Sequence, residues 1–131
     1  MSHLLDVNLL LACGWGSHAR HAEARAWLEG QPAFTTSPLS ELGFIRVSMS
    51  PGYRASFADA QTALGNITSR PQAHSIAANF PVAKLPALTA HADVTDAYLV
   101  ELARGHGLKL ATLDSDLCTK SWAAGIAENP L

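Results

Sequence analysis

Short apolar runs alternate with longer helical segments along most of this chain of 131 residues. The runs at His3–Leu5 and at residues 33–36 and 108–113 are typical of buried strands. The links between strands and helices are short, and strands that alternate with helices pair in parallel through helical crossovers. The pattern therefore predicts an α/β domain with a mainly parallel central sheet of four or five strands, covered by helices on both faces.

The helical segments have clear beginnings and ends. Asp6 can cap a helix over residues 7–13, and Pro38 opens a helix over residues 39–49. The other expected helices cover residues 18–29, 57–67 and 94–104, with short helices or turns at 86–92 and 122–124 and further strands at 73–77 and 125–128. The apolar segments 9–15 and 39–49 also predict an interface, because a small domain with little charge should hide such surface.

Length and composition predict one domain over residues 1–131. The chain is 48% hydrophobic and 15% charged, which excludes disorder and a coiled coil. Its formal net charge is −2, so any affinity for nucleic acid cannot come from bulk positive charge. Cys13 and Cys118 are too few for a disulfide framework, and the first apolar segment lacks a basic leader, so we expect a cytoplasmic protein with no membrane partner.

Acidic residues fall at the ends of the predicted elements. Asp6 and Asp114 each follow a predicted strand, whereas Glu41 and Asp96 lie in the first turns of two predicted helices. Sites in open α/β sheets form in the crevice beyond the carboxyl ends of the strands. We therefore expect these four acids, which are widely separated in sequence, to come together at that edge.

Most of these acids also have a simpler structural explanation. Asp6 suits a helix N-cap, and Asp114 suits a turn. Residues 93–96, with Asp93 and Asp96 at their ends, resemble a capping box, and Asp116 could cap the segment that follows residue 117. At this stage each acid is therefore either a local cap or a member of a shared site.

Glu41 fits a capping explanation least well. Its helix is apolar nearly all round, and a buried acid needs a partner or a metal. Arg46 lies about 140° round the helix, which makes it a poor partner. Carboxylates that converge without enough cations repel one another, and a hard divalent cation such as Mg²⁺ relieves that repulsion while leaving positions for phosphate oxygens. The residues therefore indicate metal-assisted hydrolysis of phosphodiester bonds.

Four segments together resemble the PIN-domain family, and in particular its VapC-type toxins, the ribonuclease halves of bacterial toxin–antitoxin pairs. They are residues 4–12 (LLDVNLLLA), 40–46 (SELGFIR), 95–99 (TDAYL) and 110–116 (LATLDSD). The match runs from residue 4 to residue 117. The resemblance implies an endoribonuclease dependent on Mg²⁺ or Mn²⁺, with RNA as its substrate, a homodimeric state and a small antitoxin protein as its inhibitor.

The resemblance also implies roles for individual residues. It makes four acids catalytic: Asp6, Glu41, Asp96 and Asp114. It makes four acids metal ligands: Asp6, Asp96, Asp114 and Asp116. Supporting positions are Asn8, Thr112 and Arg46, to which we add Asp93, although the family's quartet has no place for it. Residues 57–88 carry no motif of the family.

Three other classes of protein are alternatives. A degenerate PIN domain would bind RNA or dimerise without cleaving RNA, but all four acids are present here. A phosphatase-like α/β hydrolase also begins with a strand and an aspartate, yet it needs a second aspartate where this chain has Asn8. A receiver domain carries its phosphoacceptor after a middle strand and needs a paired lysine, which fits Asp6 and Asp114 poorly.

Overall fold

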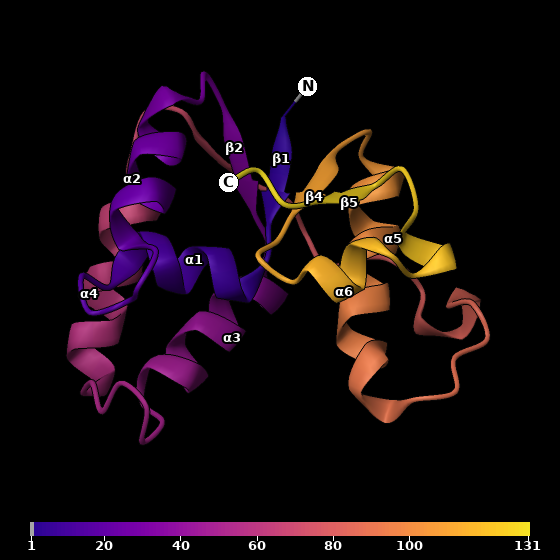
Figure 1. Cartoon of the computed structure of the whole chain (residues 1–131), viewed down its shortest axis with the longest axis horizontal. Coiled ribbons are helices and arrows are strands. Elements are labelled where there is room, and N and C mark those ends of the chain that lie inside the picture. The colour runs from indigo at the N-terminus through magenta and orange to yellow at the C-terminus, as the bar shows by residue number, and fades with distance from the viewer. Residues whose placement is uncertain (1) are drawn as a thin grey trace.

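The computed structural model describes residues 2–131, which form one five-stranded sheet (Figure 1). The strands are β1 (His3–Leu5), β2 (Phe34–Thr36), β3 (Ala73–Ser75), β4 (Lys109–Ala111) and β5 (Ala127–Glu128). Their order across the sheet is β3-β2-β1-β4-β5, and each neighbouring pair is parallel. The predicted α/β fold with a parallel sheet is therefore confirmed.

Helices make the crossovers between these strands. Within residues 2–131 the α-helices are α1 (Val7–Gly14), α2 (His21–Gly30), α3 (Pro38–Ser48), α4 (Phe57–Thr68), α5 (Val94–Gly105) and α6 (Ser115–Cys118). Short 3₁₀ helices cover η1 (Val82–Lys84), η2 (His91–Asp93) and η3 (Ser121–Ala123). Most bounds lie within two residues of those predicted.

Two α-helices differ from the prediction, η1 was not predicted, and η2 covers only the end of the short helix or turn predicted at residues 86–92. Helix α2 begins at His21 and not at residue 18, because the His18 ring accepts a hydrogen bond from the Arg20 backbone N–H at 3.0 Å and holds a turn before the helix. Helix α6 was not predicted, since its four residues are too few to show a helical period.

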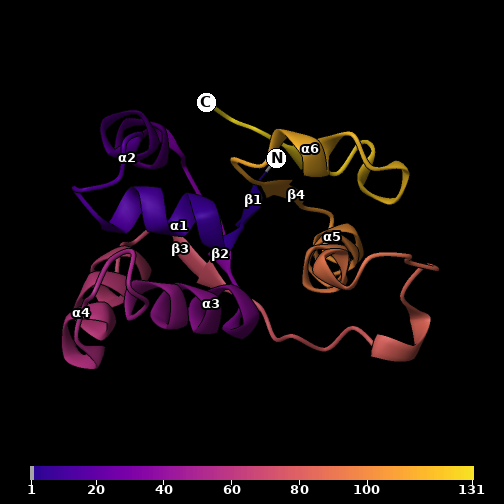
Figure 2. The same cartoon turned by 60° about the horizontal axis from the view of Figure 1, so that its bottom comes forward.

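The sheet separates two apolar cores, because neighbouring residues of a strand point to opposite faces. Leu5 packs with α1, α2, α3 and α4, whereas Leu4 packs with α5, β4 and α6. Figure 2 shows α1 to α4 gathered on the left of the strands and α5 and α6 on the right. Helix α1 is buried inside the first core over Leu9, Leu10, Leu11, Ala12 and Cys13, so the prediction that this segment forms an intermolecular interface is wrong.

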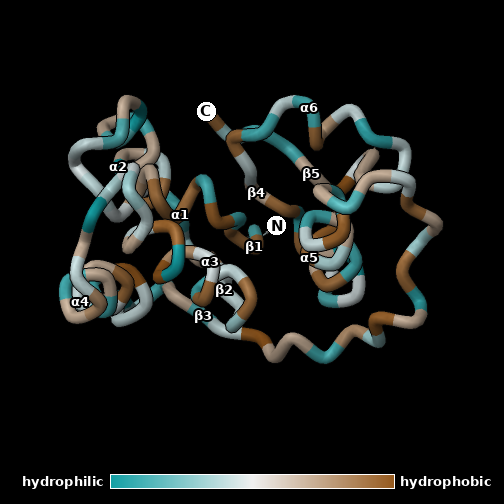
Figure 3. Tube along the Cα trace, turned by 90° about the horizontal axis from the view of Figure 1, so that it is seen from below, coloured by the Kyte–Doolittle hydropathy of each residue, from teal (hydrophilic) through white to brown (hydrophobic). Residues whose placement is uncertain are grey.

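The long segment between β3 and α5 runs along the outside of the molecule and carries apolar residues (Figure 3). No helix within residues 2–131 has both the length and the apolar character needed to cross a membrane.

Candidate active site

Asp6 lies where β1 passes into α1, and only 5% of it is exposed. Its Oδ1 accepts a hydrogen bond from the Val7 backbone N–H at 2.7 Å, so the predicted N-cap is confirmed. Its Oδ2 accepts a second hydrogen bond, from the Thr112 hydroxyl at 2.8 Å. Burial raises the pKa of Asp6, the two hydrogen bonds oppose that rise, and the charge of Asp114 adds to it.

Thr112 connects the ends of β1 and β4. These strands are adjacent, with Leu5 opposite Ala111, so Asp6 and Thr112 leave the sheet side by side. The Thr112 hydroxyl donates to Asp6 and accepts from the Asp114 backbone N–H at 3.1 Å and from the Asn8 amide at 3.1 Å. The structure therefore places Asn8 and Thr112 in one network with two of the candidate acids.

Asp114 begins α6 and is exposed. Its Oδ1 accepts hydrogen bonds from the backbone N–H groups of Asp116 and Leu117, at 3.0 and 3.1 Å. Asp114 is thus a helix cap and not only a turn residue. The expectation that Asp116 caps a later segment is wrong, because Asp116 lies inside the first turn of α6, where its side chain is exposed.

Asp96 lies in the first turn of α5 and is half-buried. Burial raises the pKa of Asp96, and the negative charges of Asp6, Asp114 and Asp93 add to the rise, which brings the pKa to about 6. These charges come from the ends of β1, β4 and η2. Three of the four acids predicted to converge, Asp6, Asp96 and Asp114, therefore lie close enough for their charges to interact.

Asp93 does not form the predicted capping box. Its side chain makes no hydrogen bond to the start of α5, because its backbone is already helical as the last residue of η2. Its Oδ2 lies 3.9 Å from the Nζ of Lys120, so Asp93 forms an ion pair with this lysine, which directly precedes η3. No sequence motif predicted this lysine beside the acids.

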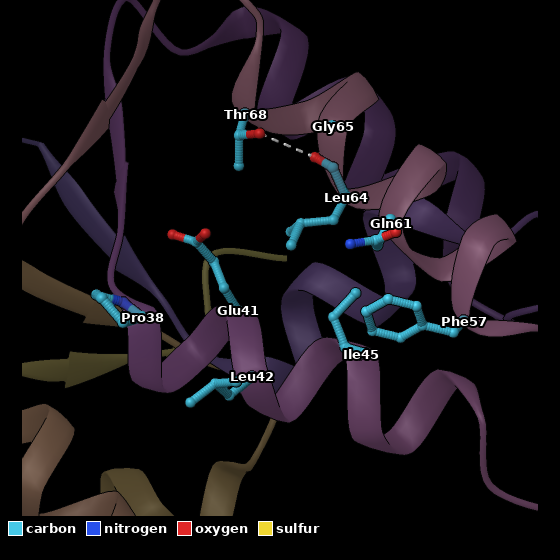
Figure 4. A pocket seen from close by; sticks show the side chains of 9 residues that line it. All are labelled: Pro38, Glu41, Leu42, Ile45, Phe57, Gln61, Leu64, Gly65 and Thr68. Carbon is cyan, nitrogen blue, oxygen red and sulfur yellow. Dashed lines mark hydrogen bonds between the residues drawn. The ribbon is translucent and has the colours of Figure 1, made fainter.

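Glu41 lies in the first turn of α3, and the charges that raise the pKa of Asp96 are those of Asp6, Asp114 and Asp93. The Oε2 of Glu41 accepts a hydrogen bond from the Thr36 hydroxyl at 3.0 Å, which supplies the partner that the sequence did not reveal. The helix that carries Glu41 is not buried on all sides, because its apolar residue Leu42 is 68% exposed. Figure 4 shows the Glu41 carboxylate directed into a hollow between α3 and α4.

Thr36 is a further candidate site residue, which the sequence pattern did not single out. It is buried, and it ends β2 at the same edge of the sheet where Asp6 follows β1. A polar residue at the carboxyl end of a predicted strand was the available signal, because sites in parallel sheets form there. Arg46, a predicted supporting residue, is exposed on α3 and lines a second hollow together with Val7 and Thr95.

The donor set at the acids suits a hard divalent cation. Asp6, Asp96 and Asp114 offer carboxylate oxygens, and Lys120 reaches Asp93 only at 3.9 Å. Among residues 2–131, no three His, Cys, Asp or Glu side chains already lie close enough together to hold a metal ion. Mg²⁺ needs no such cage, since it binds through one or two carboxylates and keeps several waters.

A family model described as "PIN domain" matches residues 3–122. The chain is also 36% identical over 123 residues to Ribonuclease VapC38 of Mycobacterium tuberculosis (strain ATCC 25618 / H37Rv), a match that covers 88% of this chain and 87% of that protein.

Two solved structures share the fold. Mycobacterium tuberculosis VapC20, described as a sarcin-ricin loop cleaving toxin, aligns with a TM-score of 0.67 at 17% identity, over 89% of this chain and 92% of that chain. VapBC2 from Rickettsia felis, bound to a DNA fragment from its promoter, aligns with a TM-score of 0.63 at 13% identity, over 98% of both chains.

Proposed function

The chain belongs to the VapC-type ribonucleases of the PIN-domain family, and we propose that it is an endoribonuclease that uses Mg²⁺ or Mn²⁺ at its acid site. The observation that carries this proposal is the position of Asp96, because the negative charges of Asp6, Asp114 and Asp93 raise the pKa of its carboxyl group. A cluster of carboxylates with few cations gains stability from a divalent ion.

Asp6, Asp96 and Asp114 would hold the ion, with Asp116 at the exposed rim of the site. Such an ion, when bound, lowers the pKa of a water molecule and neutralises charge on phosphate oxygens. The chain's own contribution is orientation, because the N–H of Val7 and the hydroxyl of Thr112 fix both oxygens of the Asp6 carboxylate.

Glu41 completes the proposed catalytic quartet by its match to the family motif. The Thr36 hydroxyl fixes one oxygen of its carboxylate, and the side chain faces the hollow between α3 and α4. We assign Glu41 a contact with the bound RNA from that side, while the three aspartates hold the ion.

The proposal extends to the partners of the chain. The relatives are ribonucleases by name, which supports RNA as the substrate, and one similar structure is of VapBC2, which supports a small antitoxin protein as the inhibitor. Apolar residues that the fold leaves exposed, such as Val82 and Val94, support a homodimer. RNA as the substrate places the proposed site of action in the cytoplasm.

Cleavage of RNA by the purified chain tests the proposal. A mixed-sequence single-stranded RNA should be cut with Mg²⁺ or Mn²⁺ and left intact with EDTA. Asp96→Asn should reduce the cleavage rate at least about a hundredfold, because it removes one charge of the metal site while keeping the side chain's shape.

Asp59→Asn is the matched control, since Asp59 is an exposed acid in the first turn of α4 and outside the acid site. This variant should cleave at the wild-type rate. Cleavage by Asp96→Asn at the wild-type rate would contradict the site. RNA binding without any metal-dependent cleavage by wild type would instead favour a degenerate PIN domain.

A further inference from the structure

Two hollows that share part of their lining lie beside α3, and one of them is lined by residues next to the acids in sequence. The second hollow, of about 560 Å³, is lined by Val7 and Thr95, the neighbours of Asp6 and Asp96. It shares Leu42, Ile45 and Phe57 with the first hollow, of about 510 Å³, which lies between α3 and α4. A strand of RNA with one phosphate at the acids could therefore place a neighbouring nucleotide in the pocket between α3 and α4.

The lining of this pocket is mostly apolar, from Leu42, Ile45, Phe57 and Leu64, and Glu41 and Gln61 add polar groups. Phe57 begins α4 and is 53% exposed, so its ring is available at the rim. Gln61 follows one helical turn later on the same face of α4. Figure 4 shows the Gln61 amide and the Glu41 carboxylate directed into the space between the two helices.

These groups are complementary to a nucleobase. An unpaired base stacks on an aromatic ring and forms hydrogen bonds along its edge with amides and carboxylates. The Oε2 of Glu41 accepts from Thr36, and Oε1 is left for a donor on the base. A purely apolar occupant, such as a leucine-rich protein segment, would cover Oε1 of Glu41 without giving that oxygen a partner, which is unfavourable.

The charge balance of the chain also favours contacts with a base over contacts with the phosphate backbone. With 9 Lys and Arg against 11 Asp and Glu, binding to the phosphate backbone gains little from overall charge. Base stacking then has to supply a larger share of RNA affinity. Arg46 is an exposed cation in the second hollow, between the acids and the pocket, where a connecting phosphate would pass.

We propose that the pocket formed by Phe57, Gln61, Glu41 and Gly65 is a specificity subsite for one unpaired nucleobase of the RNA, next to the cleaved phosphate. This inference deepens the proposed function and rests on it. It also gives a role to the beginning of the segment 57–88, which carries no motif of the family.

Gly65 allows the pocket to be filled without disturbing the fold. It lines the pocket, and a Cβ added there meets nothing within 4 Å. Leucine favours a helix more than glycine does, so Gly65→Leu should keep or raise the melting temperature while occupying the pocket. Gly30→Leu is the matched control, because Gly30 ends α2 at an exposed position where an added Cβ also meets nothing within 4 Å.

Nucleotide titrations in EDTA test the subsite independently of catalysis. The four nucleoside 5′-monophosphates are added separately to ¹⁵N-labelled protein, and amide shifts are followed by NMR. The amides of Phe57, Gln61 and Gly65 should shift with at least one nucleotide, in Asp96→Asn as well as in wild type. Gly65→Leu should weaken that binding about tenfold or more, and Gly30→Leu should not.

RNA cleavage provides the second arm. Gly65→Leu and Gln61→Leu should raise KM or change the base preference next to the cut, with kcat largely retained. The inference is overturned if Gly65→Leu cleaves with wild-type KM and base preference, or if only an apolar dye, and no nucleotide, shifts the pocket amides. The proposed function fails separately, if wild type cuts no RNA while the nucleotide shifts are still observed.

Discussion

The two oxygens of Asp6 explain why a capping residue can also belong to a functional site. One oxygen caps α1 through the Val7 N–H, and the other accepts from the Thr112 hydroxyl at 2.8 Å. Capping statistics alone would favour a purely structural role for such an aspartate. The hydroxyl of Thr112 distinguishes the two explanations, because it connects Asp6 to Asp114 across the edge of the sheet.

Removing that hydroxyl should destabilise the fold. Thr112 is fully buried, and Thr112→Val removes the hydrogen-bond partner of the Asp6 Oδ2 and of the Asp114 N–H. We expect a loss of about 1–3 kcal/mol in the free energy of unfolding, measured by urea denaturation. Thr112→Ser keeps the hydroxyl and should lose clearly less. Equal stability of Thr112→Val and wild type would show that the network contributes nothing.

The raised pKa of Asp96 predicts a pH dependence of the metal-free protein. Its pKa is about 6 in the folded chain against an ordinary value of 3.8, so the folded state binds the proton more tightly. The stabilisation that this proton gives is complete below pH ~4 and is lost as pH rises through ~6.

Comparison of wild type with Asp96→Asn isolates this effect. At pH 4 the two proteins should differ little, and at pH 7.5 in EDTA the variant should be more stable by about 1 kcal/mol, because water screens a half-buried carboxyl group. Urea denaturation at several pH values measures the difference. A constant difference between pH 4 and pH 7.5 would refute the raised pKa.

At the scale of elements, two glycines of neighbouring helices have opposite surroundings. An added Cβ at Gly43 of α3 would lie 2.4 Å from the Val7 Cγ2 at the start of α1, whereas an added Cβ at Gly65 of α4 meets nothing within 4 Å. Val7 is β-branched and has little rotamer freedom in a helix, so it cannot easily move aside. Helix α3 can therefore approach α1 closely only because residue 43 has no side chain.

Alanine at each position tests this contrast. Gly43→Ala should cost about 1–3 kcal/mol, because overpacking outweighs the better helix propensity of alanine. Gly65→Ala should gain up to about 1 kcal/mol from the same propensity without the clash. Thermal unfolding of both variants measures the two signs. A stabilising Gly43→Ala would mean that α3 and α1 are not packed as described.

Elements with a long apolar period or a clear strand-and-cap signal could be predicted from the sequence. Helices α3, α4 and α5 begin within one residue of their predicted starts, because Pro38 and polar caps mark them. Local sequence signals gave wrong or incomplete predictions where contacts between distant segments determine the conformation. The capping box at Asp93 did not form because η2 already fixes its backbone as helical. The partner of Glu41 comes from β2, and no spacing within α3 could have revealed Thr36.

At the scale of the whole molecule, exposed apolar residues predict self-association. Val82 on η1 is 68% exposed and Val94 at the start of α5 is 43% exposed. Both line a hollow of about 330 Å³ with Leu39 and Tyr98. This surface replaces α1 as the candidate dimer interface, since α1 is buried within the monomer.

Light scattering measures the oligomeric state directly. At high micromolar concentration we expect a mass of twice 13.9 kDa, because the apolar hollow would be covered by a second copy of the chain. Val82→Glu should shift the mass towards 13.9 kDa by placing a charge in the interface. A monomeric wild type under these conditions would exclude the homodimer.

The central claim is that acids from separate elements share one metal site, and paired melting curves test it most directly. In EDTA at pH 7.5, Asp96→Asn should melt above wild type, because it removes the repulsion among Asp6, Asp96 and Asp114. Saturating Mn²⁺ should reverse this order, since an ion at a hundred times its Kd stabilises the native site by about 2.7 kcal/mol, and more in wild type than in the variant. A wild type that ignores Mn²⁺ and a variant no more stable in EDTA would contradict the shared site.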